Sequence, residues 1–275
     1  MKQYLAIDIG GTAVKLGIVD EEGRVLSKTE QSVCFDNYET PILTTVLSAA
    51  EQFLKEQAVE PQGLAGIGVS AAGQIDTRKG IVAGTCGSLP NYIGSPIKAE
   101  LEAKFGLPTT VANDANCMTL GEVWVGGAKG YTDVIGVTLG TGVGGGIIAN
   151  GQLVRGVHFT AGEYSFVNTN AEAWDAPDQN MACQCSTSNL LKWYRARKAL
   201  PEDAPLDGRS FFAAANAGEP EALEVLRRFC HAVAVQIYNL TVLLDVEKVA
   251  IGGGISKQPL LLESLRSAYD GLYAS

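Results

Sequence analysis

An asparagine and an aspartate stand side by side, as Asn113 and Asp114, where the stretch VANDANC (111–117) changes from an apolar run to a helical pattern. Aspartate is preferred at the start of a helix, because its carboxylate accepts a hydrogen bond from an unpaired backbone N–H. A carboxylate can also be a general base that takes a proton from a hydroxyl group. Asp114 is therefore a helix cap, a base or both, since a helix N-terminus favours an ionised carboxylate near neutral pH.

Three turns in the sequence are rich in glycine: GGT at 10–12, GTG at 140–142 and GGG at 252–254. Phosphate groups approach backbone N–H groups most closely where side chains are absent, and glycine also adopts the positive φ angles of tight turns. The first two turns lead into strand-like runs, whereas a Walker loop or a dinucleotide-binding fingerprint leads into a helix. These turns are either plain hairpins or phosphate-binding hairpins of another kind.

Asp8 lies in the apolar run YLAIDIGG, directly before the first glycine turn. A carboxylate buried in a strand is costly unless it is paired or faces a metal ion. We predict that Asp8 holds Mg²⁺ near phosphate groups, through water. Lys15 is either close to the transferred phosphate or a solvated strand lysine, and Thr12 and Thr141 are either phosphate ligands or ordinary β-branched residues.

Hydrophobic periodicity predicts the elements that position these residues. Three short strands are expected within 4–32, followed by a helix at 40–58 and a buried strand at 64–72. The later elements are expected to be a helix at 95–105, a strand at 108–114, a helix at 115–127, a helix at 219–245 and a strand at 248–256.

The sequence contains an internal repeat. Residues 133–150 show the same order of apolar run, glycine turn with threonine and apolar run as the N-terminus. This order predicts two related halves, and a chain of 275 residues suits two domains of about 100–150 residues. We predict an N-terminal lobe at 1–115 and a C-terminal lobe at 116–275.

Composition excludes several classes of partner. The net charge of −9 argues against binding to nucleic acid or to anionic lipid. No apolar run reaches the roughly 18–20 residues of a membrane span, and the N-terminus lacks the pattern of a signal peptide. Six scattered cysteines are expected to be reduced thiols, so we predict a cytoplasmic protein with a small-molecule ligand.

Five motifs in this order resemble the ROK family of sugar kinases, within the actin/hexokinase/Hsp70 superfold. The motifs are DIGGTAVKLGIVD (8–20), VANDANC (111–117), LGTGVGGGI (139–147), AGE (161–163) and IGGGIS (251–256). They span nearly the whole chain, and the resemblance is greatest to the β-glucoside kinase branch. It implies an α/β fold of two actin-like ATPase lobes, each ribonuclease H-like, with a cleft between them.

The resemblance implies an ATP-dependent kinase that phosphorylates a sugar 6-hydroxyl. Asp114 matches the catalytic base, and Asn113 and Glu163 match contacts to sugar hydroxyls. Relatives are often homodimers, which we expect here, and they usually continue beyond the segment after Ser256, so we interpret this chain as truncated. The residues expected to bind ATP and Mg²⁺ are Asp8, Gly10, Gly11, Thr12, Lys15, Thr138, Gly140, Thr141, Gly142, Gly252, Gly253 and Gly254.

The sequence departs from the family at a structural zinc site. Most similar members carry a histidine three residues after the glutamate of AGE, and a cysteine cluster C-x-C-x₄-C. Phe166 stands at the histidine position, and Leu190 stands where a third cysteine should follow Cys183 and Cys185. Two thiolates are too few for a closed four-ligand site, so we predict no zinc; the alternative is a site completed by a distant residue such as His158.

Phe166 also bears on the substrate. In zinc-bearing relatives that histidine, together with a glutamate at the position of Lys192, lies near the anomeric end of the sugar. A buried polar contact rejects analogues that lack its partner, so an aromatic ring in its place admits a sugar substituted at C1. We predict a β-glucoside such as cellobiose as substrate; the alternative is that Phe166 only fills the space left by zinc. Asn91 is either a further sugar-pocket residue or a turn residue after proline.

Three other functions compete with this prediction. ROK transcriptional repressors carry a winged-helix segment before the DIGGT motif, whereas the motif begins here at residue 8 of an acidic chain. A regulatory module that binds sugar without turnover is disfavoured by the presence of Asp8, Asp114 and both phosphate turns. A kinase for a free hexose, such as glucose, fructose or N-acetylmannosamine, is the main alternative.

Overall fold

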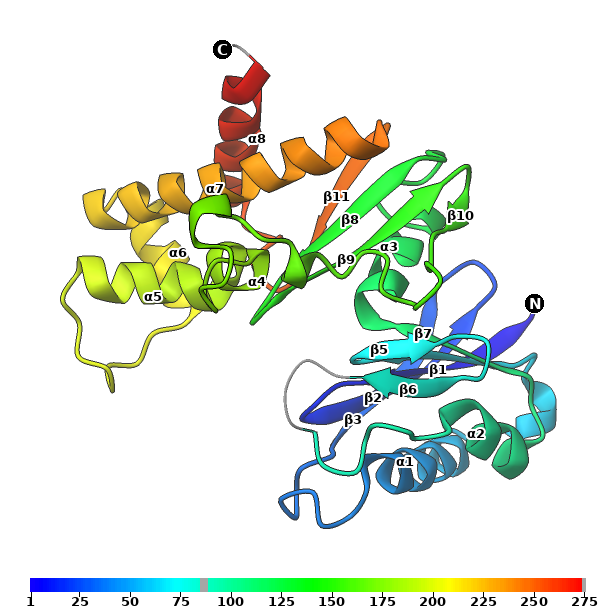
Figure 1. Ribbon diagram of the computed structural model, residues 1–275. Coiled ribbons are helices and arrows are strands. Elements are labelled where there is room, and N and C mark those ends of the chain that lie inside the picture. The colour runs from blue at the N-terminus through cyan, green and yellow to red at the C-terminus, as the bar shows by residue number, and fades with distance from the viewer. Residues whose placement is uncertain (85–88, 274–275) are drawn as a thin grey trace. The chain divides into compact units, whose positions relative to one another are not determined.

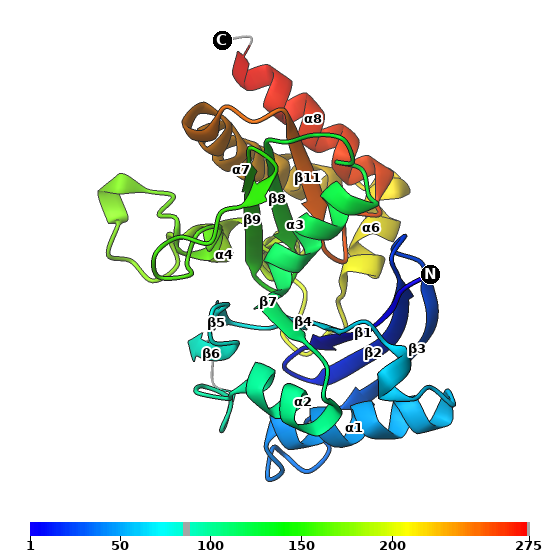
Figure 2. The same cartoon turned by 90° about the vertical axis from the view of Figure 1, so that its right-hand side faces the viewer.

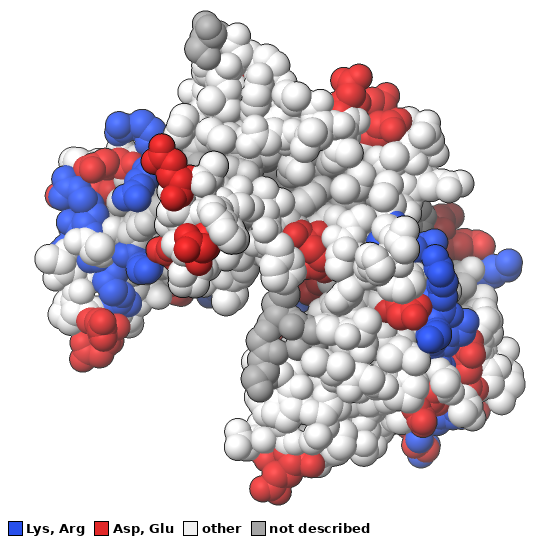
Figure 3. All heavy atoms as spheres, in the orientation of Figure 1, with Lys and Arg blue, Asp and Glu red and all other residues white. Residues whose placement is uncertain are grey.

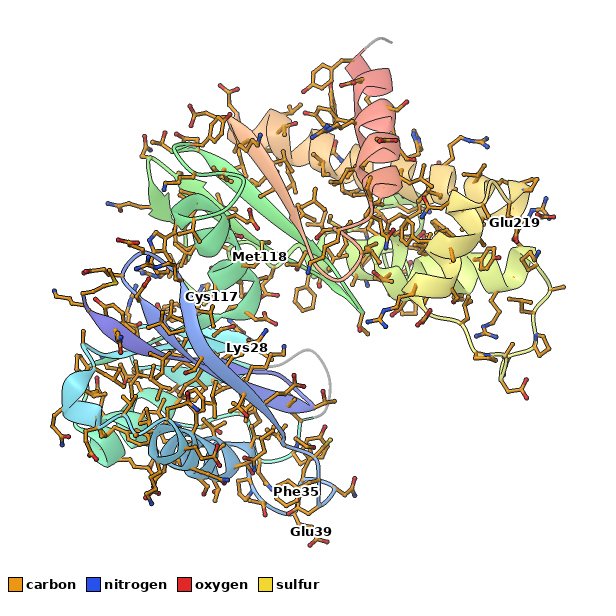
Figure 4. The ribbon with its side chains drawn as sticks, turned by 180° about the vertical axis from the view of Figure 1, so that it is seen from behind. Lys28, Phe35, Glu39, Cys117, Met118 and Glu219 are labelled. Atoms are coloured by element: carbon orange, nitrogen blue, oxygen red, sulfur yellow. The ribbon has the colours of Figure 1, made fainter. Side chains whose placement is uncertain are left out.

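The computed structural model describes residues 1–84 and 89–273, which belong to two compact units (Figure 1). The first unit consists of Met1–Cys117 together with Arg155–Ala161, and the second of Met118–Val154 together with Gly162–Ser275. Helix α3 (Asp114–Trp124) contains the boundary, because Cys117 belongs to the first unit and Met118 to the second. Both residues are labelled on that helix in Figure 4.

The first unit is built on a five-stranded sheet with the order β3-β2-β1-β4-β7. Its first three strands form an antiparallel meander, whereas β4 runs parallel to both β1 and β7. Helices α1 (Ile42–Glu56) and α2 (Ile97–Phe105) cover one face of the sheet (Figure 1). The strands are β1 (Gln3–Ile9), β2 (Ala13–Asp20), β3 (Val25–Ser32), β4 (Ile67–Ala71) and β7 (Thr109–Asn113), and the smaller elements are η1 (Pro61–Gly63) and the hairpin of β5 (Gln74–Asp76) and β6 (Ile81–Gly84).

Alternation along β1 separates a core face from an open face. Leu5, Ile7 and Ile9 are buried in one hydrophobic cluster with Phe53 of α1. The residues between them, which include Asp8, are only partly buried. Successive side chains of a strand point to opposite faces, so the sequence of β1 places Asp8 on the face away from this core.

The second unit is built on a four-stranded sheet with the order β10-β9-β8-β11. Helix α3 lies on one face of this sheet, and the long helix α7 lies on the other (Figure 2). The approach of α3 is close, because a Cβ at Gly136 of β8 would lie 2.1 Å from the Thr119 hydroxyl oxygen. The elements are β8 (Val134–Leu139), β9 (Val143–Ala149), β10 (Gln152–Leu153), η2 (Tyr164–Phe166), η3 (Ala171–Ala173), α4 (Met181–Cys185), α5 (Thr187–Arg197), α6 (Gly208–Asn216), α7 (Pro220–Leu244), β11 (Lys248–Gly252) and α8 (Pro259–Tyr273).

The two sheets share one strand scheme, of which the internal repeat predicted the opening hairpin. In the first sheet β1 and β2 form a hairpin and β4 runs parallel to β1, and in the second β8 and β9 form a hairpin and β11 runs parallel to β8. The turns are also alike. The N–H of Gly10 donates to the carbonyl of Ala13 (2.9 Å), and the N–H of Gly140 donates to the carbonyl of Gly142 (3.0 Å).

Most predicted elements are present with shifted ends. The helix predicted at 115–127 begins one residue earlier, at Asp114, and ends at Trp124. Two glycines, Gly126 and Gly127, follow, and glycine disfavours further helix. The sequence did not predict the β5–β6 hairpin or helices α5, α6 and α8.

Two further findings concern the helices and the cysteines. Within residues 1–84 and 89–273, none of the helices combines the length and the apolar character that a membrane crossing requires. The described cysteines are all free thiols, whereas Cys86 lies outside the described residues; the free thiols are Cys34, Cys117, Cys183, Cys185 and Cys230.

The turn after β11 generates a test of the fold. Gly253 has a φ angle of 95°, and a Cβ there would lie 2.3 Å from the carbonyl oxygen of Leu139, whereas a Cβ at Gly254 meets no atom within 4 Å. We expect Gly253→Ala to lower the free energy of unfolding by about 1–3 kcal/mol, because strain and overlap add. Gly254→Ala should change it by less than about 0.5 kcal/mol. Urea unfolding measures both, and equal losses would contradict this account.

Candidate active site

Three polar side chains of the first unit meet because their strands are in register. Asp8 of β1 lies opposite Lys15 of β2 and beside Ser70 of β4. The Lys15 Nζ lies 3.2 Å from Asp8 Oδ2, and the Ser70 hydroxyl donates a hydrogen bond of 2.7 Å to Asp8 Oδ1. The carboxylate of Asp8 therefore has one cationic and one neutral partner.

Asp8 is too exposed for the argument that a buried carboxylate needs a metal ion. The sequence was interpreted as placing this carboxylate in a buried strand, but 44% of the Asp8 side chain and 61% of the Lys15 side chain are exposed. The correction follows from β1, which buries one face only. A metal ion is not needed to offset burial here, although an exposed carboxylate beside a phosphate-sized turn still suits Mg²⁺ held through water. Lys15 is both solvated and paired.

Asn113, and not Asp114, caps helix α3. The helix begins at Asp114, and Asn113 Oδ1 accepts hydrogen bonds from the N–H groups of Ala115 (2.9 Å) and Asn116 (3.1 Å). This pattern belongs to the residue that precedes the first helical position. The Asn113 Nδ2 donates to the carbonyl of Gly73 (2.9 Å) and to Asp114 Oδ1 (2.9 Å). The interpretation of Asp114 as the cap was therefore wrong, because Asp114 occupies the first turn itself.

The surroundings of Asp114 raise its pKa above the ordinary value of 3.8. The largest cause is protein that displaces water from the carboxylate, and the negative charge of Asp8 adds to the rise. Hydrogen bonds from the Ala115 N–H and from Asn113 lower the pKa but do not cancel the rise. Sequence reasoning considered only the helix N-terminus, which favours the ionised form, and so missed the net direction. Residue 114 keeps exposed surface, so water screens part of the effect.

A buried tyrosine and a partly buried cysteine lie close to the same charges. Tyr92 is 1% exposed, and its hydroxyl has no hydrogen-bond partner among the described residues. Burial raises the pKa of Tyr92, and the charges of Asp114 and Asp8 raise it further. The same three causes raise the pKa of Cys117, one turn along α3, to about 12. Both groups are neutral at physiological pH, which leaves Asp8 and Asp114 as the negative charges of this cluster.

The first glycine turn keeps backbone donors available. Its carbonyl groups are occupied, because the Tyr38 hydroxyl donates to Gly11 (2.8 Å) and the Val33 N–H donates to Thr12 (2.9 Å). Among the described residues, the N–H groups of Gly11 and Thr12 donate to no backbone carbonyl. Free N–H groups in a turn without bulky side chains can bind phosphate oxygens. Gly10 has a different role, since its N–H closes the turn.

The second glycine turn is held in a similar way. The Gly140 carbonyl accepts from the Thr187 N–H (2.8 Å), and Thr138 Oγ1 accepts from the Gly144 N–H (2.9 Å). In the described chain, the N–H groups of Thr141 and Gly142 likewise donate to no backbone carbonyl. Thr138 thus stabilises the hairpin, whereas Thr141 and Gly142 present free donors.

A cavity of about 480 Å³ in the second unit brings two of the predicted turns together. Gly140 and Thr141 of the second turn line it, and so does Gly254 of the third. Gly252 and Gly253 are not part of this lining. A Cβ at Gly252 would lie 2.9 Å from the Met118 sulfur, so both glycines are explained by close packing. Their role in nucleotide binding stays a prediction.

Two helices begin at this cavity. Thr187 and Ser188 of α5 and Gly208 and Arg209 of α6 line it, and these residues form the first turns of their helices. A helix N-terminus carries partial positive charge and unpaired N–H groups, which favour anions such as phosphate. The cavity therefore combines a glycine turn with two helix ends that suit a polyphosphate ligand.

Sequence reasoning missed the contribution of these helix ends. Ser186 caps α5, and Asp207 forms a capping box with Ser210 at the start of α6. The pattern D-x-x-S at 207–210 was the available indication. Ser70 was missed as well, because only the strand register shows that it lies beside Asp8.

The predicted sugar contacts Glu163 and Phe166 lie around η2 in the second unit. Neighbouring residues attach this turn to β9, because the Tyr164 hydroxyl donates to the Gly146 carbonyl and the Ser165 hydroxyl donates to the Val143 carbonyl. Tyr164 is buried, whereas 69% of Phe166 is exposed. A side chain so exposed does not fill an internal space, which disfavours the interpretation of Phe166 as a filler for zinc.

Asn91 adopts a turn conformation in the first unit. Its φ angle is 55°, in the left-handed region that asparagine tolerates, and its side chain is exposed. The structure thus supports the turn interpretation, and the role of Asn91 in a sugar pocket stays a prediction.

The two cysteines of the reduced zinc motif differ in environment. Cys185 is fully buried, as is Leu190, which stands at the third cysteine position, whereas Cys183 is partly exposed. Burial raises the pKa of Cys185 to about 12. Among the described residues, no three His, Cys, Asp or Glu side chains form a group that could hold a metal ion.

Comparisons with known proteins identify the family of this chain. The family model described as "ROK family" matches residues 4–274. The β-glucoside kinase of Klebsiella pneumoniae is 34% identical over 264 residues, which cover 95% of this chain and 84% of that protein. The β-glucoside kinase of Listeria innocua is 32% identical over 262 residues, which cover 95% of this chain and 85% of that protein.

A solved structure extends the comparison to the fold. The ROK family glucokinase of Streptomyces griseus, in complex with glucose and AMPPNP, superposes with a TM-score of 0.81 at 28% identity, over 99% of this chain and 90% of that one. The predicted fold class, two actin-like ATPase lobes, and the predicted reaction class, a sugar phosphotransferase, are both confirmed by these relatives. The chain belongs to the ROK family.

Proposed function

We propose that this protein transfers the γ-phosphoryl group of ATP to the 6-hydroxyl of a β-glucoside, with Asp114 as the base. The observation that carries the proposal is the placement of Asp114 in the first turn of α3, tethered by Asn113 and with a raised pKa. A base with a pKa nearer to neutrality accepts a proton more readily from a hydroxyl group. The relatives support the substrate class, because two of them are named β-glucoside kinases.

In the proposed reaction, the sugar oxygen forms a bond to the γ-phosphorus as the bond to the β-phosphate oxygen breaks. The hydroxyl proton goes to the Asp114 carboxylate. Phosphoryl transfer passes through a loose transition state, so positioning and neutralisation of charge supply most of the rate. The free N–H groups of Gly11, Thr12 and Thr141 are suited to that neutralisation.

The residues of the first unit fit a magnesium ion. Mg²⁺ is commonly bound through one or two carboxylates, several waters and the phosphates of a substrate. Asp8 supplies one partly exposed carboxylate beside the first glycine turn, and Ser70 and Lys15 orient it. When bound, Mg²⁺ neutralises charge on the phosphate oxygens. We propose no zinc site, because Leu190 cannot replace a thiolate ligand.

The anomeric end of the sugar is proposed to lie against Phe166. An exposed aromatic ring offers an apolar surface to an aglycone or a second sugar, and burying it there is favourable. Glu163, on the same turn, is proposed to contact ring hydroxyls. The competing candidate is a kinase for free glucose, which is favoured by the similarity to the glucokinase of Streptomyces griseus. A homodimer remains a prediction.

Removing the base tests the catalytic proposal. Asp114→Asn keeps the size of the side chain but cannot accept the proton, so we expect kcat to fall by about 10²–10⁴-fold. Coupled ADP release with MgATP and cellobiose measures this rate. Asp203→Asn, in an exposed loop, is the matched control and should leave kcat unchanged. A near-normal rate for Asp114→Asn would falsify the assignment.

The raised pKa of Asp114 predicts how its removal changes stability. The folded state holds the Asp114 proton more tightly than the unfolded state, so ionisation of this group destabilises the fold at neutral pH. Asp114→Asn should therefore unfold at higher denaturant concentration at pH 7, by a small margin because residue 114 is partly exposed. The gain should vanish as the pH falls below the ordinary value of 3.8. A variant less stable than the parent at pH 7 would contradict the upward shift.

The substrate proposal predicts a preference for substituted sugars. We expect higher kcat/KM with cellobiose and an aryl β-glucoside than with glucose, N-acetylmannosamine or fructose. Phe166→Ala should lower kcat/KM for the aryl β-glucoside by about 10-fold and leave that for glucose nearly unchanged, because only the aglycone loses its apolar contact. The measurement is coupled ADP release with each sugar.

The control for this variant is Phe35→Ala. Phe35 is 61% exposed and lies in the first unit, between β3 and α1, where Figure 4 labels it. It should not change the ratio between sugars. Equal losses on glucose and on the glucoside for Phe166→Ala, or a parent enzyme that prefers glucose, would favour the free-hexose kinase.

A further inference from the structure

An exposed tryptophan lies between η2 and α4 of the second unit. Trp174 follows η3 directly and is 72% exposed, although tryptophan is highly buried in most proteins. Among residues 1–84 and 89–273, its ring stacks on no other aromatic ring and its indole N–H donates no hydrogen bond. We call residues 168–180 the Trp174 loop, and Figure 2 shows it, in yellow-green, standing out before α4.

Hydrogen bonds close the Trp174 loop into a compact unit. Its ends meet at an antiparallel bridge between Asn168 and Asn180. The Thr169 N–H and hydroxyl both donate to the Gln179 carbonyl, at 2.7 and 2.8 Å. Within the loop, Asn168 Nδ2 donates to the Trp174 carbonyl (2.8 Å). The backbone that carries the indole is therefore fixed, and a rigid aromatic side chain loses little conformational entropy when it binds a ligand.

The same asparagine connects Trp174 with Phe166, the proposed contact of the aglycone. Asn168 follows Phe166 by two residues, each a Cα step of about 3.8 Å, and its side chain is bonded to the Trp174 carbonyl. Both aromatic side chains are exposed. A ligand that extends beyond Phe166 along this part of the second unit therefore meets Trp174 next.

The charges of the Trp174 loop suit a neutral ligand that is rich in hydroxyl groups. Its sequence, NTNAEAWDAPDQN, contains Glu172, Asp175 and Asp178 but no lysine, arginine or histidine. Figure 3 shows acidic side chains on the part of the second unit that carries η3 and α4. In the part of the chain that the structure describes, the carboxylates of Glu172 and Asp175 form no ion pair and accept no hydrogen bond. Carboxylates repel anions but accept hydrogen bonds from hydroxyl groups.

A sugar ring matches the indole as well as the carboxylates. The C–H groups of a β-glucose unit form an apolar face, and packing this face on an aromatic ring removes both surfaces from water. The positively polarised C–H groups also meet the negative face of the π system. Patches that bind other proteins are usually contiguous apolar surfaces of more than a few hundred Å², whereas Trp174 is one ring among polar neighbours. The surroundings of Trp174 therefore favour a sugar over a protein partner.

We propose that Trp174 binds the third ring of a β-linked glucose oligosaccharide, counted from the ring that is phosphorylated. The second ring lies against Phe166, as proposed above, and the chain continues to the indole. Glu172 and Asp175 accept hydrogen bonds from hydroxyl groups of the third ring. The inference rests on the proposed β-glucoside kinase activity and extends its substrates from cellobiose to longer β-linked chains.

Calorimetric titration of the full chain with cellobiose and with cellotriose, without ATP, tests the proposal. We expect cellotriose to bind about tenfold more tightly than cellobiose, because only the longer sugar reaches the indole. Trp174→Ala should lose this difference, with weaker binding of cellotriose and a nearly unchanged Kd for cellobiose. Trp174→Phe keeps an aromatic face and should retain most of the difference.

Trp124→Ala is the control for the loss of an exposed tryptophan. Trp124 is 49% exposed and ends α3, away from the Trp174 loop in the sequence, so the variant should change neither Kd. Equal affinities of the parent chain for the two sugars would overturn the proposal. So would a preference for cellotriose that persists in Trp174→Ala.

Coupled ADP release separates this proposal from the proposed kinase function. In Trp174→Ala, kcat/KM for cellotriose should fall about tenfold, and that for cellobiose should change by less than about twofold. A chain that binds both sugars as expected but phosphorylates neither would refute the kinase function and support Trp174 as a sugar-binding residue. A chain that phosphorylates cellobiose and cellotriose equally well, with or without the indole, would refute the role of Trp174 alone.

Discussion

The hydrogen bonds of the Asn113 side chain determine where Asp114 is held, and the proposed chemistry depends on them. One amide caps α3 through its oxygen and joins the β4–β5 turn to the Asp114 carboxylate through its nitrogen. A cap of this kind is worth about 1 kcal/mol to the helix. Because the same amide also fixes the carboxylate, the stability of the first turn and the orientation of the base cannot be separated. Asn113 is in that sense a positioning residue, whether or not it also contacts sugar.

The two sheets share a strand scheme but place different chemistry before their turns. Asp8 and Thr138 stand at equivalent positions, two residues before the first glycine of each turn. In the first sheet the neighbouring strands supply Lys15 and Ser70, which hold a partly exposed carboxylate suited to a cation. In the second sheet the Thr138 hydroxyl accepts a hydrogen bond from the Gly144 N–H within the hairpin. The positive charge beside this turn comes from the N-termini of α5 and α6. The first turn is thus suited to a metal-bound phosphate, and the second to a phosphate bound by N–H groups.

The sequence was sufficient for features that depend on local pattern. Alternation and glycine turns predicted both hairpins, and apolar runs predicted the strands at 64–72 and 248–256 but not that these strands run parallel to β1 and β8. Contacts between residues far apart in the sequence could not be predicted from local pattern. The partnership of Ser70 with Asp8 requires the register of β1 and β4, and the convergence of α5 and α6 on one cavity requires their packing. The rise in the pKa of Asp114 could not be predicted for the same reason. Loss of water around the carboxylate and the charge of Asp8 raise the pKa more than the start of the helix lowers it.

The altered zinc motif separates a structural role from a substrate role. Met181, Cys185 and Leu190 are all fully buried in the core of the second unit, so apolar packing holds α4 and α5 together. Burial of a leucine side chain contributes about 1.5–3 kcal/mol, which offsets part of what a structural metal supplies. Phe166, at the histidine position of the motif, is exposed and does not join this core. Phe166 stays exposed on a turn that Tyr164 and Ser165 anchor, which is compatible with the proposed contact between its ring and the aglycone.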